Sequence, residues 1–68
     1  MTPKKQITVR MPYRVDTPTL PPLFCRSEDE ALSAAEARHR EGRGESALHT
    51  LVAARDGSES FHFWRTAP

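Results

Sequence analysis

The chain has little of what small proteins use to stabilise themselves or to build a chemical site. It contains one cysteine, Cys25, among its 68 residues, which excludes an intrachain disulfide. It has three glycines, and the Gly-x-Gly at 42–44 lacks the further glycine and following helix of phosphate-binding fingerprints. A chain this short buries only about 60% of the surface that its unfolded form exposes. We therefore expect no deep pocket, and we expect stability to draw on oligomerisation or partner binding.

Long apolar runs are also missing. No run approaches the roughly 20 apolar residues that a membrane-spanning helix needs. The first residues, Met1 to Lys5, lead into alternating polar and apolar positions, where a signal peptide would have an apolar core. These features predict a cytoplasmic protein that has no contact with a membrane.

The net charge of +1 hides a division between the two parts of the chain. Residues 1–26 carry five Lys or Arg and one Asp, a net charge of +4, whereas residues 27–60 carry four Arg and eight acids, a net charge of −4. A surface divided in this way favours steering of a charged protein partner over neutralisation of a polyanion.

The N-terminal part alternates with a period of two, which is typical of a strand with one buried face. Pro12 lacks an amide hydrogen, so this strand is expected at a sheet edge. Prolines at 18, 21 and 22 then predict a stiff crossing segment with neither helix nor regular ladder. Cys25 closes a short apolar stretch and is expected to be a small buried side chain without reactivity. The apolar positions of the strand are Ile7, Val9, Met11, Tyr13 and Val15.

The sequence Ser27-Glu28-Asp29-Glu30 is a capping box, in which Ser27 caps the amide of Glu30 at the start of a helix. Basic residues 38–40 suit the negative end of the helix dipole, and Gly42 provides a C-terminal stop. One side of this helix is expected to face the core, and it is rich in alanine: Ala31, Leu32, Ala34, Ala35 and His39.

Asp56-Gly57 lies between two apolar runs, 48–54 and 61–66, and predicts a hairpin with a two-residue type I′ turn. This turn places Val52 opposite Phe61 and His49 opposite Trp64. The core face of the hairpin is then expected to carry Leu48, Val52, Phe61 and Phe63.

These elements predict one two-layer α+β domain over residues 1–68, with one helix packed on a three-stranded antiparallel sheet. A right-handed crossover would make the first two strands of this β-α-β-β chain parallel, with the third strand between them. The expected strand order is therefore 2-3-1.

No catalytic constellation is apparent, because the acids fall in the first helical turn, in loops or in surface pairs. His49 and His62 are expected diagonally on one outer face, but a zinc site needs three or four ligands. We therefore expect a protein that is not an enzyme and that holds no metal or cofactor.

The outer sheet face is the best candidate for function. It is expected to expose Ala47, His49, Leu51, His62 and Trp64, and exposed aromatic patches usually mark binding surfaces. We predict that Trp64, His62, His49 and Leu51 contact a partner, together with Arg10 and Arg14.

The favoured function is a protein-binding module that occludes a larger protein, or a protein–nucleic acid complex, and a homodimer is a further possibility. In size and in its one-helix-on-a-sheet plan, the chain is similar to small inhibitors encoded by phages and mobile elements, including anti-CRISPR proteins. No residue motif carries this likeness. The alternative is a nucleic-acid-binding or regulatory domain that uses the basic N-terminal half, and nine acids against ten bases make it less favoured.

Overall fold

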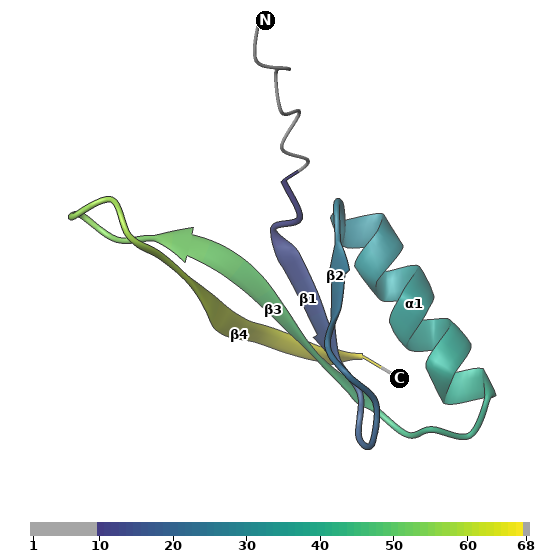
Figure 1. Cartoon of the computed structure of the whole chain (residues 1–68). Helices are drawn as coiled ribbons and strands as arrows, with labels where there is room; N and C mark the ends of the chain where they lie inside the picture. The colour runs from purple at the N-terminus through teal and green to yellow at the C-terminus, as the bar shows by residue number, and fades with distance from the viewer. Residues whose placement is uncertain (1–9, 68) are drawn as a thin grey trace, which may run out of the picture.

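The computed structural model describes residues 10–67 and shows one helix packed against an antiparallel sheet of four strands (Figure 1). The elements are β1 (Tyr13–Asp16), β2 (Leu23–Cys25), α1 (Glu28–Arg40), β3 (Ser46–Ala53) and β4 (Glu59–Ala67). The small α+β fold with an antiparallel sheet is thus as predicted. Within residues 10–67, no helix has the length and the apolar character needed to cross a membrane.

Helix α1 begins and ends where the sequence predicts. The side-chain oxygen of Ser27 accepts from the amide of Glu30 at 3.2 Å, which confirms the cap. At the other end Gly42 has φ +80°, and the amide of Arg43 donates to the carbonyl of Arg38 at 3.0 Å. This pattern is a Schellman motif, which requires a left-handed residue after the helix and favours glycine there.

The strand order is β2-β1-β3-β4, so the predicted three strands and the order 2-3-1 are wrong. The proline-containing segment is the loop of a hairpin, closed by a bond of 3.1 Å from the amide of Leu20 to the carbonyl of Thr17. It returns the chain as β2 beside β1. The crossover through α1 therefore starts from β2 and ends at β3, and β1 lies between these two strands. The prediction failed because a three-residue strand has too little pattern to recognise.

Strand β1 is consequently an interior strand, and the predicted edge position is wrong. Pro12 precedes the first ladder residue, Tyr13, and its carbonyl accepts from the amide of Leu51 at 2.8 Å. Pro12 thus lies directly opposite Leu51, and its missing amide hydrogen leaves out only the reciprocal bond to the carbonyl of Leu51, just before the start of the ladder. Ile7 and Val9, at the start of the predicted strand, lie outside the described residues.

The β3–β4 hairpin has a three-residue loop, Arg55-Asp56-Gly57, in place of the predicted two-residue turn. The amide of Ala54 donates to the carbonyl of Ser58 at 2.7 Å, and Gly57 has the positive φ (+88°) typical of such loops. Leu51 then lies opposite Phe61, one residue away from the predicted register. A slip of one residue moves every side chain of a strand to the other face.

A bulge near the end of the hairpin reverses this change. His49 lies opposite Phe63, but Leu48 lies opposite Arg65, so Trp64 is an extra residue on β4. The residues from Arg65 onward thus return to the predicted register. Before the bulge the side chains of β4 alternate, so Trp64 packs against the core, whereas Phe61 and Phe63 point to the opposite face. Their predicted place in the core is wrong.

The core lies between α1 and the sheet and is thin. It consists of Val15, Cys25, Ala31, Ala35, Leu48 and Ala67, with Tyr13, Leu32 and Trp64 packed against it. The small buried face of α1 confirms the alanine-rich side predicted for this helix. Val52 shares the face of Leu48 but is 42% exposed, because the hairpin extends past the helix (Figure 1).

Cys25 is only 1% exposed, which confirms it as a buried side chain. Burial, with a smaller contribution from the carboxylate of Glu30, raises the pKa of its thiol. The thiolate is the reactive form, so this environment suppresses reactivity.

Hydrogen bonds between buried polar groups also hold the helix against the sheet. The hydroxyls of Thr17 and Ser46 lie 2.8 Å apart in the interior, and the guanidinium of Arg38 donates to Thr17 Oγ1 at 2.8 Å. The last turn of α1 is therefore held against the ends of β1 and β3.

Candidate binding site on the open sheet face

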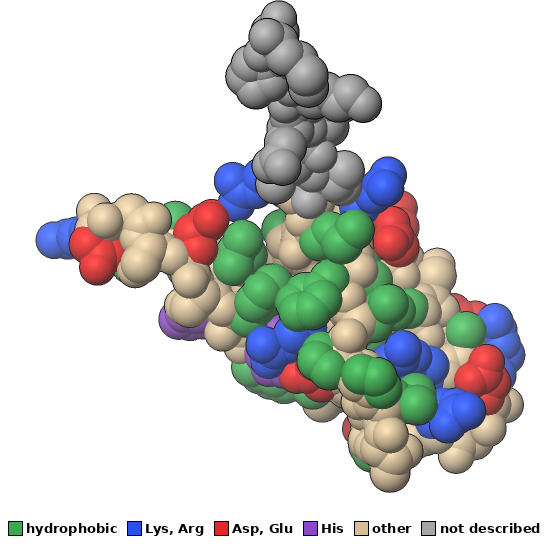
Figure 2. Space-filling model, viewed as in Figure 1, with side chains coloured by type: hydrophobic (Ala, Val, Ile, Leu, Met, Phe, Trp, Pro, Cys, Tyr) green, Lys and Arg blue, Asp and Glu red, His purple; other side chains and the backbone are tan. Residues whose placement is uncertain are grey.

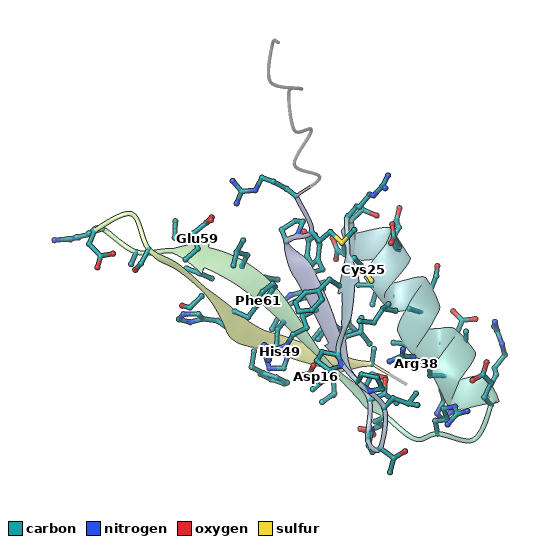
Figure 3. The ribbon with its side chains drawn as sticks, viewed as in Figure 1. Asp16, Cys25, Arg38, His49, Glu59 and Phe61 are labelled. Atoms are coloured by element: carbon teal, nitrogen blue, oxygen red, sulfur yellow. The ribbon has the colours of Figure 1, made fainter. Side chains whose placement is uncertain are left out.

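The sheet face turned away from α1 carries four large apolar side chains, Phe24, Leu51, Phe61 and Phe63. We call it the open face, and the strand pairing assigns to it Arg14, Asp16, Phe24, His49, Leu51, Phe61 and Phe63. Figure 3 shows Asp16, His49 and Phe61 together in front of the strands, whereas Cys25 and Arg38 lie towards the helix. The face is built from all four strands, and no helix of the described chain covers it.

Three phenylalanine rings form the apolar part of the open face. Phe24 comes from β2 and Phe61 from β4, and their ring centres lie 5.6 Å apart in a tilted arrangement. Phe24 is 44% exposed and Phe63 is 61% exposed. Figure 2 shows hydrophobic side chains gathered over the middle of the sheet, next to a small group of charged ones. Large rings left this open to water are typical of a surface that binds another molecule.

The charged group lies beside these rings. The guanidinium of Arg14 forms an ion pair with Asp16 at 3.0 Å, and its central carbon lies 5.2 Å from the centre of the Phe61 ring. Nδ1 of His49 lies 3.4 Å from the same Asp16 carboxylate, and its ring meets Phe63 edge-on at 5.8 Å. A cation over an aromatic face is attracted by the ring quadrupole.

Two atoms of this charged group are buried and have no hydrogen-bond partner among the described residues, Nε of Arg14 and Nδ1 of His49. The 3.4 Å approach of His49 to Asp16 is therefore a close contact but not an aligned hydrogen bond. The rings and the sheet already shield these polar atoms from water. A partner that docks here has less polar surface left to desolvate.

The predicted site residues divide between the two faces. His49 and Leu51 lie on the open face as expected, and Arg14 lies on the same face. Arg10 is exposed at its margin and forms an ion pair with Glu59 at 2.7 Å.

Trp64 and His62 do not lie on the open face, so their predicted placement beside His49 is wrong. Trp64 packs against the core, and its ring centre lies 6.1 Å from that of Tyr13. His62 lies opposite Thr50 on the helix side of the sheet and contacts Ser60 Oγ at 3.0 Å. The one-residue difference in the hairpin register accounts for both corrections.

The sequence prediction missed three aromatic members of the open face, Phe24, Phe61 and Phe63. A three-residue loop is a known alternative for a hairpin with Asp-Gly at its tip, and that register would have placed Phe61 and Phe63 correctly. Phe24 has no such signal, because only pairing with β1 makes its short segment a strand.

The described surface contains no pocket. Within residues 10–67, no three His, Cys, Asp or Glu side chains come together in a way that could hold a metal ion. His49 and His62, considered as the start of a metal site, lie on opposite faces of the sheet. The open face is thus a shallow aromatic surface with a paired charge.

Comparisons with known proteins identify no relative. No protein-family model matches the sequence, and the searches of curated proteins and of solved structures found no significant match.

Proposed function

We propose that the chain is a non-enzymatic protein-binding module that acts by covering part of a larger protein or of a protein–nucleic acid complex. One observation carries the proposal: Phe24 and Phe63 remain exposed on a sheet face that no described helix covers. Aromatic side chains are enriched at the centres of protein interfaces, where they contribute much of the binding energy.

The paired charges on and beside the open face favour a protein over a nucleic acid as partner. Arg14 is paired with Asp16, and Arg10 with Glu59. Binding driven by phosphates needs cations that are free to replace counterions. A face with balanced charges and exposed rings suits a mixed apolar and polar protein surface better.

The alternative function, binding of single-stranded nucleic acid, draws on the same three rings. Bases stack on aromatic side chains of open sheet faces, and Arg14 adds a planar cation among them. Lys4 and Lys5, which the basic N-terminal half would contribute, lie outside the described residues. Salt separates the two functions, because phosphate contacts weaken steeply as salt rises and an apolar protein contact changes little.

The proposed mode of action is occlusion. A small scaffold without a pocket can inhibit a larger protein by covering a surface that this protein needs. Inhibitors encoded by phages and mobile elements, including anti-CRISPR proteins, are similar in size and plan, and we propose a role of this kind in the cytoplasm. This part of the proposal draws on likeness of plan alone.

The experiment is capture of a partner from the native host with the immobilised full chain and two variants. Phe24→Asp places a charge on the open face, and the matched control Val52→Asp places one at a comparably exposed apolar side chain on the other face. We expect the wild type and Val52→Asp to retain the same protein, and Phe24→Asp to lose it. Circular dichroism checks that both variants fold.

Two results would contradict the proposal. One is a partner retained equally by Phe24→Asp and the wild type. The other is capture of nucleic acid alone that is released by modest salt, which would support the alternative.

A further inference from the structure

The outer edge of β4 is a second surface, separate from the open face. In the order β2-β1-β3-β4 this nine-residue strand forms one edge, and none of residues 10–67 pairs with its outer side. The other edge, β2, has only three residues. Proteins usually protect long edge strands with lysine, proline or inward-pointing charges. β4 contains no lysine and no proline, and its charged residues are Glu59 and Arg65.

The hydrogen bonds of β3 show which backbone groups of β4 point outward. The amide of Leu51 donates to Pro12 on the β1 side of β3, so Leu51 and its partner Phe61 are not a hydrogen-bonded pair. The amide and carbonyl of Phe61 therefore point away from β3. Because this property alternates along an antiparallel pair, the same holds for Glu59 and Phe63.

The bulge at Trp64 limits the regular part of this edge. Trp64 has no single partner on β3, which interrupts the alternation of backbone groups. The regular outer edge thus runs from Glu59 to Phe63, with Phe61 at its centre.

We propose that this edge pairs with the same edge of a second copy of the chain, antiparallel, about a two-fold axis at Phe61. In this register Phe61 lies opposite Phe61 of the second copy. Glu59 of each copy lies opposite Phe63 of the other. Within residues 59–63, no other register places every residue whose backbone groups point outward opposite another such residue of the second copy. A symmetric interface of this kind closes after two copies and leaves no further edge of β4.

The side chains of this segment are compatible with the register. The two Phe61 rings meet on the open face, where aromatic cross-strand pairs stabilise a sheet. The two Glu59 carboxylates stand four residues apart, roughly 13 Å at about 3.3 Å per residue, so they repel little. On the helix side Ser60 meets His62 of the second copy, and these two residue types already contact each other within the chain at 3.0 Å.

The thin core gives a reason for association. The largest fully buried side chains are Leu48 and Val15, and the chain has no disulfide to supplement them. Small domains of this kind commonly gain stability by oligomerising. Edge pairing leaves the open face uncovered, so this inference does not depend on the proposed function.

Cysteine cross-linking tests the register. Ser60 and His62 of the second copy would form a pair without backbone hydrogen bonds, with Cα atoms about 4.5 Å apart, a distance that a disulfide can bridge. We expect a mixture of Ser60→Cys and His62→Cys chains, carrying tags of different size, to form the mixed disulfide on oxidation. Each variant alone should cross-link far less, and buried Cys25 should not take part. Efficient cross-linking of His62→Cys alone, or no cross-linking in the mixture, would overturn the proposal.

Sedimentation gives an independent test. The wild type is expected to sediment with twice the mass of the chain. Glu59→Pro removes an outward amide hydrogen that the pairing needs, and Glu59→Ala is the matched control because both variants lose the contact with Arg10. We expect Glu59→Ala to remain dimeric and Glu59→Pro to shift to the single mass. A monomeric wild type, or a Glu59→Pro variant as dimeric as the control, would overturn the proposal.

Discussion

The guanidinium of Arg14 lies over the ring of Phe61, 5.2 Å from its centre, although the two residues are in strands that do not pair with each other. β3 separates them, and the long arginine side chain spans it to reach the ring. Asp16 holds the same guanidinium at 3.0 Å. Arg14 therefore joins the apolar and charged parts of the open face.

Replacing Arg14 is expected to destabilise the fold. Arg14→Ala loses the ion pair, the ring contact and the packing of its methylene groups, together about 1–2 kcal/mol of unfolding free energy. Arg14→Lys should lose about half as much, because an ammonium lacks the planar face that stacks on a ring. Urea denaturation followed by circular dichroism measures the unfolding free energy of both variants. Arg55→Ala, in the exposed hairpin loop, is the control and should change the value by less than about 0.5 kcal/mol.

Trp64 and Phe63 are neighbours in the sequence, but truncation of Trp64 should destabilise the fold more than truncation of Phe63. Trp64→Ala removes a ring that packs on the core and on Tyr13, and we expect a loss of about 2–3 kcal/mol of unfolding free energy. Phe63→Ala removes a ring that is 61% exposed and should cost less than about 1 kcal/mol. Urea denaturation followed by circular dichroism compares the two variants. The reverse order of losses would mean that Phe63 is the core residue and that the hairpin has the other register.

Asp56 should make the stability of the hairpin depend on pH. Its carboxylate accepts from the hydroxyl of Ser58 at 2.6 Å and from the amide of Ser58 at 3.0 Å, and these bonds lower the pKa of Asp56. A carboxyl whose pKa is lowered by folding stabilises the fold at pH values above its pKa in the unfolded chain. This contribution is lost as the pH falls through its pKa in the folded chain. Asp56→Asn should therefore be less stable than the wild type near neutral pH. The difference should shrink once pH falls below about 4.

Urea denaturation of the wild type and Asp56→Asn over a series of pH values measures this difference. Glu45→Gln, in the exposed loop before β3, serves as the control for removal of one surface carboxylate. A difference between the wild type and Asp56→Asn that stays constant down to acidic pH would show that the charge of Asp56 does not stabilise the hairpin.

The helix could be predicted from the sequence because its signals are local. Ser27 caps Glu30 three residues away, and Gly42 adopts its positive φ directly after the last turn. The interactions that start and end α1 are made within the helix and its flanks, so neighbouring residue types are enough to define them.

The sheet was predicted less well because its signals are not local. The strand Leu23–Cys25 exists through its pairing with β1, and three residues carry no period of their own. In the β3–β4 hairpin, Asp-Gly is compatible with loops of two or three residues, and the choice decides which face every side chain of β4 takes.

The sequence by itself determined the class of the fold, the bounds of the helix, its alanine-rich buried side and the burial of Cys25. It also predicted an open aromatic face that includes His49 and Leu51, with Arg14 among the partner contacts. The tertiary structure decided which rings occupy that face: Phe24, Phe61 and Phe63, with Trp64 turned into the core. The physical reason is that side chains alternate along a strand, so a loop that is one residue longer moves the side chains from Glu59 to Trp64 to the other face without changing the pattern of residue types.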